Sequence, residues 1–125
     1  MRIDRMVKAI VAAMEDIKAK DVVVLDVSKM TALFDRMIVA SADSSRQTKA
    51  ISGNVQEKLK ALGAKVYGVE GEQSGEWVLV DLGQVVVHIM QPASRAYYNL
   101  EELWGEQHAA TPKKRVRRPK LAATP

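Results

Sequence analysis

A near-continuous run of β-branched and aliphatic residues, Val22-Val23-Val24-Leu25-Asp26-Val27, constrains the fold more than any other feature of this sequence. Runs of this kind are typical of strands in sheets that are covered on both faces. The run therefore predicts a buried strand with helices on either side of its sheet. One such helix precedes it, because apolar residues recur at helical spacing and the charged residues between them fall on the opposite face. Those apolar residues are Ile3, Met6, Val7, Ile10, Val11, Met14 and Ile17.

The remaining strands are short and apolar, and the last two form a hairpin. Gly83-Gln84 makes the tight connection within this hairpin, and Gly71 and Gly75 bracket a turn before it. Residues 28–35 read as an irregular segment with room for a helical turn. The strands are predicted at residues 37–40, 65–70, 77–82 and 85–90.

Capping residues mark two further helices. Ala42-Asp43-Ser44-Ser45 precedes a long helix that Gly63 can stop, and Pro92 at a first helical position opens a third helix over 93–103 that ends at Trp104-Gly105. The order is α-β-β-α-β-β-β-α. It predicts an α/β (α+β) fold, a single-domain mixed β-sheet flanked by helices.

Positive charge is concentrated at the C-terminal end. The 125 residues carry a net charge of +4, but residues 107–125 hold six Lys/Arg and no acid. Residues 1–106 hold 13 Lys/Arg against 15 Asp/Glu, which gives −2. The last segment also contains three of the four prolines and no aromatic residue, so burial cannot offset the entropy of ordering it. We expect a domain at 1–106 and a flexible basic tail at 107–125.

Several functional classes are excluded by what the sequence lacks. Without cysteine there is no disulfide scaffold, thiol catalysis or cysteine-bound zinc, and a cytoplasmic location is expected. No apolar run approaches the ~20 residues of a membrane span, and no signal-peptide core is evident. The common phosphate-, dinucleotide-, esterase- and zinc-protease motifs are absent, so we expect no cofactor or metal. His88, in an apolar strand, is expected to bond a neighbour rather than act as a base, and His108 to be solvated.

Two polar groupings leave more than one interpretation. Carboxylates can hold Mg²⁺ at strand ends, but each of Asp26, Asp35, Asp43 and Asp81 stands alone in the sequence. A strand-end turn for Asp26, a cap for Asp43 and a hairpin-edge position for Asp81 are the plainer interpretations. Ser44-Ser45-Arg46-Gln47 is either simple helix capping or an anion site in which Ser45 and Arg46 assist free backbone N–H groups.

Aromatic residues favour binding over catalysis. Strand alternation places Trp77 and Asp81 on one face, and a core face would not normally include an aspartate. Trp77 is therefore a candidate half-exposed anchor of the type enriched at interfaces, although a core position stays open. Tyr97, Tyr98 and Trp104 crowd the last helix, where most of the apolar side chains are expected to pack in the core. With few catalytic groups and several anchors, we expect a binding protein and not an enzyme.

Several segments, in one order and at one spacing, carry a family resemblance over about residues 3–105. They are the strand from Asp21 to Val27, Ser44-Ser45-Arg46-Gln47, Gly68-Val69-Glu70-Gly71, Glu76 to Gly83, Val86 to Met90, and Tyr97-Tyr98 through Gly105. Together they resemble the ribosomal silencing factor family (RsfS/Iojap). The basic tail lies outside this resemblance.

The resemblance implies a nucleotidyltransferase-like fold without the catalytic motif, because the Gly-Ser and paired-aspartate signature is missing. It also implies a homodimer that binds the large ribosomal subunit through the universal ribosomal protein fourteen. Bound there, it would block joining of the small subunit and reduce translation under nutrient limitation. The basic tail would add nonspecific contact with ribosomal RNA.

The partner-binding residues follow from the resemblance. Trp77 and Leu82 would be anchors, Asp81 and Glu70 polar partners of a basic protein, and Gly71 and Gly83 would allow close backbone approach, with Tyr98 as a further contact. Two alternatives remain. One is a nucleotidyltransferase-like enzyme that uses Asp26, Asp81 and Ser44, and the other is a general RNA-binding protein that acts through its tail.

Overall fold

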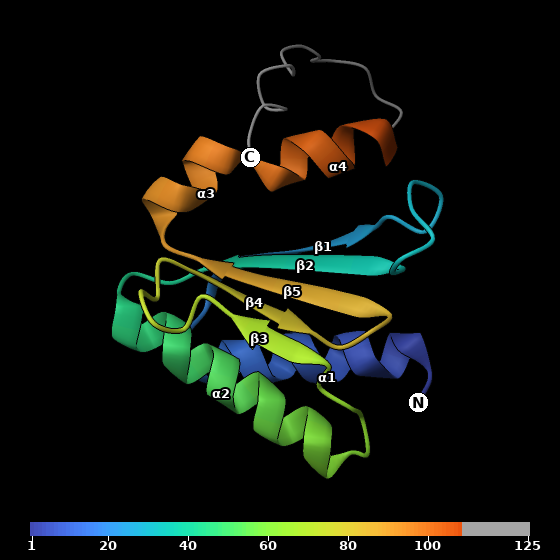
Figure 1. Ribbon diagram of the computed structural model, residues 1–125, viewed down its shortest axis with the longest axis horizontal. Coiled ribbons are helices and arrows are strands. Elements are labelled where there is room, and N and C mark those ends of the chain that lie inside the picture. The colour runs from blue at the N-terminus through green and yellow to red at the C-terminus, as the bar shows by residue number, and fades with distance from the viewer. Residues whose placement is uncertain (109–125) are drawn as a thin grey trace.

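A five-stranded mixed sheet of order β1-β2-β5-β4-β3 is the frame of the computed structural model, which describes residues 1–108 (Figure 1). β2 and β5 are parallel, and the other neighbouring pairs are antiparallel. The predicted mixed sheet flanked by helices is confirmed, whereas most of the predicted basic tail lies outside the described residues. The elements are α1 (Ile3–Asp16), β1 (Lys20–Asp26), β2 (Arg36–Ser41), α2 (Ser45–Ala61), β3 (Gly68–Glu70), β4 (Trp77–Asp81), β5 (Val85–Met90), α3 (Pro92–Tyr98) and α4 (Leu100–His108).

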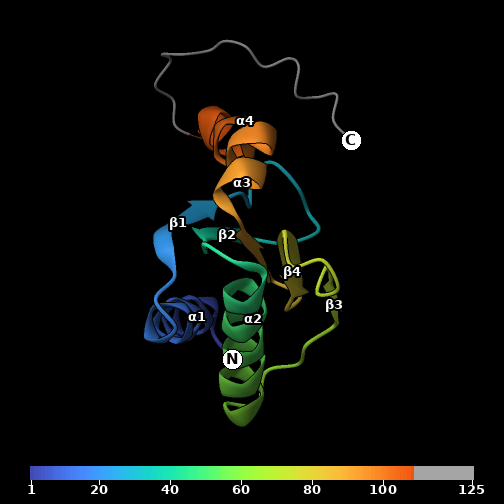
Figure 2. The same cartoon turned by 90° about the vertical axis from the view of Figure 1, so that its left-hand side faces the viewer.

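Helices lie on both faces of the sheet (Figure 2). α1 and α2 cover one face, where the larger core forms from residues such as Ile10, Ile51 and Ile89, all without exposed surface. α3 and α4 lie on the opposite face over a smaller core that includes Met37 and Val39. The central strands β2 and β5 are therefore the ones that are buried on both sides.

The expectation that residues 22–27 form a buried strand is wrong, although helices contact both of its faces. β1 is an edge strand that pairs only with β2, and its side chains are exposed or half-buried, with Val24 41% exposed. A β-branched run reports strand propensity and cannot tell a central strand from an edge one. The register shifts between Lys20 and Val23, and Asp21 has φ +50, an irregularity of the kind that protects edges from unwanted pairing.

Two other predicted boundaries differ from the structure. The strand expected at 65–70 is regular only from Gly68, and the single helix expected after Pro92 is two helices. Asn99 separates them with φ +46, a conformation that asparagine tolerates better than most residues. The second helix then runs on to His108 instead of ending at Trp104-Gly105. The break allows α4 to turn so that Leu100 and Trp104 pack on the smaller core.

The predicted helix and hairpin signals are confirmed. The Ser44 side chain caps α2 by accepting a hydrogen bond of 3.1 Å from the backbone N–H of Gln47. Gly63, with φ +94, directly follows Leu62, the C-cap residue of α2. β4 and β5 form the antiparallel hairpin, and the backbone N–H of Gly83 in its turn donates to Oδ1 of Asp81 at 2.9 Å.

Substitution of two glycines by alanine should change the free energy of unfolding in opposite directions. An alanine Cβ at Gly71 (φ +86) would overlap the backbone carbonyl of Trp77, so Gly71→Ala should lower the free energy of unfolding by about 1–3 kcal/mol. Gly53 lies in the interior of α2, where the space that an alanine Cβ would occupy is open, so Gly53→Ala should raise it by about 0.5–1 kcal/mol. Urea unfolding followed by circular dichroism measures both, and equal stabilities would contradict this account of the turn.

Candidate functional site

The two faces of the sheet are covered unequally along β4. Val78 and Val80, which face α1 and α2, have no exposed surface, whereas Trp77, Leu79 and Asp81 on the opposite face are half-buried. On the face of Trp77, α4 packs against β1 and α3 packs against β5 (Figure 2), so these helices lie toward the β1 edge of the sheet. The β3–β4 side of the face is therefore partly open. The prediction that Trp77 and Asp81 share a face is confirmed.

A groove lies between this open face, α4 and the loop before β2; we call it the docking groove. It has a volume of about 520 Å³ and its walls are mostly apolar. Leu33 stands at its edge with 82% of its surface exposed, which is unusual for a leucine. The lining residues are Leu33, Phe34, Met37, Leu79, Asp81, Gly83, Val86, His88, Leu100 and Trp104.

The register of the sheet aligns the groove residues in rows. Glu70 pairs with Leu79, and Leu79 pairs with His88, so these three side chains lie on one face in one row. Glu70 is the exposed outer end of that row, and Gly71 follows it directly. In the next row, Asp81 pairs with Val86. Carboxylates therefore border an apolar strip.

Trp77 is held from two sides beside the docking groove. Its Nε1–H donates a hydrogen bond of 2.9 Å to Nδ1 of His88. Its ring centroid lies 4.6 Å from that of Tyr98 on α3, which brings two expected site residues together. Burial lowers the pKa of His88 from 6.5 to about 4, so its imidazole is neutral at pH 7 and can accept this bond. The expectation that His88 bonds a neighbour is confirmed.

The other expected contact residues are distributed around the same hairpin. Gly83 lines the docking groove, and Asp81 uses Oδ1 to hold the hairpin turn. Leu82 is only 3% exposed and packs in the larger core. Its side chain stabilises the hairpin and offers almost no surface to a partner.

Several of the polar groups considered for nucleotide or anion chemistry bond to other residues of the fold. Lys20 Nζ lies 2.6 Å from Asp43 Oδ2, and this hydrogen bond raises the pKa of Lys20. Asp26 on the edge strand bonds Ser28 and lies 3.2 Å from Arg36 Nη1. Within residues 1–108, no group of three His, Cys, Asp or Glu side chains is placed to hold a metal ion.

The serine cluster at the start of α2 serves mainly to fasten a loop. The Ser45 hydroxyl donates to the carbonyl of Ser74 at 2.8 Å and accepts from Gln91 Nε2 at 3.2 Å. The Gln47 amide donates to the carbonyl of Ile17 at 3.1 Å. Arg46 remains exposed beside them. The bond from Ser45 to Ser74 fixes the loop that leads into β4 and Trp77, whereas the bond from Gln47 joins the start of α2 to the end of α1.

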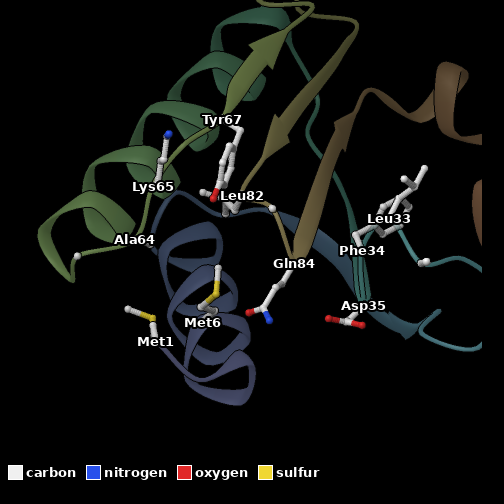
Figure 3. Close-up of a pocket in the computed structure, with 13 residues that line it drawn as sticks. Met1, Met6, Leu33, Phe34, Asp35, Ala64, Lys65, Tyr67, Leu82 and Gln84 are labelled. Carbon is white, nitrogen blue, oxygen red and sulfur yellow. The ribbon is translucent and has the colours of Figure 1, made fainter.

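A second, more polar hollow lies at the other side of the Leu33–Phe34 loop (Figure 3). It has a volume of about 500 Å³, and it shares Leu33, Phe34 and Gly83 with the docking groove. Lys65 Nζ lies 4.9 Å from the ring centroid of Tyr67, which is 61% exposed. Charged and amide side chains interrupt its apolar lining, so we regard the docking groove as the stronger candidate.

Sequence reasoning named none of the apolar side chains that line the docking groove as site residues, and three of them show why. Leu79 and Val86 lie on the face of Trp77 and Asp81, so extending the same alternation would have found Leu79. Val86 follows from the hairpin register once the turn at Gly83 is known. Leu33 lies in an irregular segment without periodicity, and nothing in the sequence indicates its exposure.

Comparison with known proteins gives consistent matches. The family described as "Ribosomal silencing factor during starvation" (RsfS) matches residues 1–124. A Chromobacterium violaceum protein named ribosomal silencing factor RsfS is 57% identical over 107 residues, 86% of this chain and 88% of that protein. The Haemophilus influenzae protein of the same name is 37% identical over 99 residues, 79% of this chain and 97% of its own.

A solved structure extends the comparison to the fold. The crystal structure of a Chromobacterium violaceum protein superposes with a TM-score of 0.83 at 51% identity, covering 98% of this chain and 100% of that one.

Among the helices of residues 1–108, none is long and apolar enough to cross a membrane.

An ion pair between α3 and α4 helps to hold α4, which forms one wall of the docking groove. Arg95, whose side chain is 12% exposed, donates from Nε and Nη2 to the two Glu101 oxygens at 3.1 and 2.8 Å, and from Nη1 to Ser41 Oγ at 2.8 Å. Glu101→Gln leaves this cation without its charged partner and should lower the free energy of unfolding by about 1–3 kcal/mol.

Asp43→Asn is the matched control for that variant. It breaks the Lys20–Asp43 pair, in which both side chains are more than half exposed (58% and 59%), and should leave the free energy of unfolding almost unchanged because solvent screens the pair. Denaturant unfolding of the two variants measures the difference. Equal losses would show that the Arg95–Glu101 pair does not hold α4.

Proposed function

This chain belongs to the ribosomal silencing factor family, whose members are ribosome-associated regulators of translation, and we propose that it binds the large ribosomal subunit and blocks joining of the small one. The proposed target is ribosomal protein fourteen of that subunit, and the proposed result is reduced translation under nutrient limitation. The observation that best supports this proposal is the docking groove, an apolar surface bordered by carboxylates on an otherwise well-covered sheet.

Blocking by occupancy suits a site of this kind. A protein bound at the surface where two subunits meet needs no bond-making step; it has only to hold that surface against the incoming subunit. Affinity would come from apolar and aromatic side chains buried in the centre of the interface. The family is a regulatory one, and the docking groove provides such a centre in Leu79, Val86 and the neighbouring Trp77.

Charge would select the partner. Residues 1–106 carry a net charge of −2, and Glu70 and Asp81 border the docking groove, which complements a basic protein better than the phosphates of bare RNA. Gly71 and Gly83 both have positive φ, but the space that a Cβ would occupy is filled by the Trp77 carbonyl and the Tyr67 ring, so these glycines shape the turns and do not give a partner backbone the close approach expected there. Tyr98 would extend the aromatic surface beside Trp77.

Self-association belongs to the same proposal. The homodimer that the family resemblance implies would have to leave the docking groove accessible, or dissociate before the ribosome is bound. Sedimentation equilibrium at several protein concentrations gives the oligomeric state directly.

Truncation of Trp77 tests the docking surface, by which we mean the docking groove together with Trp77 and Tyr98 beside it. Trp77→Ala should weaken binding to isolated large subunits about 30-fold, because removal of a buried interface aromatic costs about 2 kcal/mol or more. Tyr67→Ala is the matched control, since Tyr67 is an exposed aromatic outside the docking groove. Binding is measured by titration with labelled protein after circular dichroism has shown that both variants fold.

Leu33 tests the same surface without disturbing the core. Leu33→Ser should weaken binding, whereas Leu62→Ser, which changes a leucine 42% exposed at the end of α2, should not. Normal affinity in folded Trp77→Ala and Leu33→Ser would show that the docking groove is not the contact surface.

The basic segment makes a separate prediction that does not depend on the docking groove. Removal of residues 109–125 takes away the six basic charges of the C-terminal end. If they contact ribosomal RNA, the truncated chain should lose affinity most at low salt and show a shallower salt dependence, while Trp77→Ala still weakens its binding. An affinity unchanged at every salt concentration would reject this role.

A further inference from the structure

We propose that His88 is the positioning residue of the docking surface: its Nδ1 atom fixes the orientation of the Trp77 indole and thereby the shape that the surface presents to a partner. The hydrogen bond stands independently of the proposed function, whereas its consequence for binding rests on that function.

The sheet register brings the two side chains together. Trp77 pairs with Met90 and Leu79 pairs with His88, so Trp77 and His88 are diagonal neighbours on the same face of the β4–β5 hairpin. The Nε1 to Nδ1 distance is 2.9 Å, and the ring centroids lie 5.8 Å apart. The loop before Trp77 is itself fastened to α2, because Thr48 Oγ1 donates to the carbonyl of Gly75 at 2.7 Å. Backbone and side chain of Trp77 are thus fixed by different contacts.

The bond requires one tautomer of the histidine. An indole N–H can only donate, so Nδ1 must carry the lone pair and Nε2 the proton. Burial of His88, which is 9% exposed, keeps the imidazole in its neutral form at pH 7. The titratable side chains nearest on the same face are Glu70 in its row, Asp81 in the next row and Tyr98 on α3. Protonation would place two donors against each other and break the bond.

His88 is the one hydrogen-bond partner of the Trp77 indole among the residues that the structure describes. The other large contact of the indole is the Tyr98 ring, which packs against it without a polar bond. Loss of the acceptor would leave a half-buried N–H unsatisfied, a cost that favours rotation of the ring toward water. Because His88 is itself buried, we expect it to act on a partner through Trp77.

The unmodified protein gives the first test, which needs no partner. In ¹⁵N-labelled chain, a scalar coupling across the N–H···N bond should connect Trp77 Nε1 to His88 Nδ1, and the histidine should appear as the Nε2–H tautomer. Trp104, the second tryptophan, provides an internal comparison. An Nδ1–H tautomer, or an indole proton of Trp77 that exchanges with water as fast as a free indole, would overturn the proposal.

Substitutions then separate positioning from direct contact. His88→Phe should move the Trp77 indole resonance but not that of Trp104, and should weaken large-subunit binding roughly tenfold. His88→Gln, whose amide oxygen can accept, should restore part of both. In a Trp77→Ala background, His88→Phe should have no further effect on affinity, and an additive loss would contradict action through Trp77.

The two proposals fail in different ways. If the unmodified chain does not bind large subunits, the proposed function is wrong, and the coupling and tautomer still decide the positioning of Trp77. If it binds and His88→Phe leaves both the indole resonance and the affinity unchanged, the positioning role is wrong while the proposed function stands.

Discussion

The parallel pairing of β2 with β5 is the constraint on which the rest of the structure depends. From Ile38 to Ala40 and from Val87 to Met90, both strands are almost without exposed surface, so each face of this pair must be covered. α1 and α2 cover one face, and α3 with α4 covers the other. The α3–α4 pair is short, and it covers the β1–β2–β5 side. β4 is thereby left only partly covered on that face, and the docking groove is the result.

The incomplete cover by α3 and α4 explains why the docking surface is apolar although it is partly exposed. A face designed to be solvent-exposed would be polar, but the open side of β4 and β5 continues the apolar strip of a buried strand pair through Leu79 and Val86. Trp77 closes one end of the strip, where His88 and Tyr98 hold it. Exposed apolar surface of this kind is uncommon unless it binds something. The proposed role as a blocker of subunit joining uses that surface without chemistry.

Local sequence patterns predicted most of the fold, because helical spacing, capping residues and glycine turns are local properties. The amphipathic pattern from Ile3 gave α1, Ser44 and Gly63 delimited α2, and the hairpin around Gly83 was placed correctly. The position of a strand within the sheet is not local. The valine run of β1 therefore suggested a buried strand, whereas β2 and β5 are the strands that are buried on both faces. The break at Asn99 also depended on packing of α4 against the sheet.

The same distinction applies to the site. Alternation along β4 placed Trp77 and Asp81 on one face, and it also placed Leu82 with Val78 and Val80 on the buried face, against the anchor role that the resemblance implied for Leu82. The exposure of Leu33 could not be predicted in this way, since it depends on segments distant in the sequence. The most direct measurement of the central claim is sucrose-gradient sedimentation of mixed ribosomal subunits with and without this protein. We expect it to sediment with the large subunit and to decrease the joined peak. Protein that stays at the top of the gradient while joining proceeds would contradict the account.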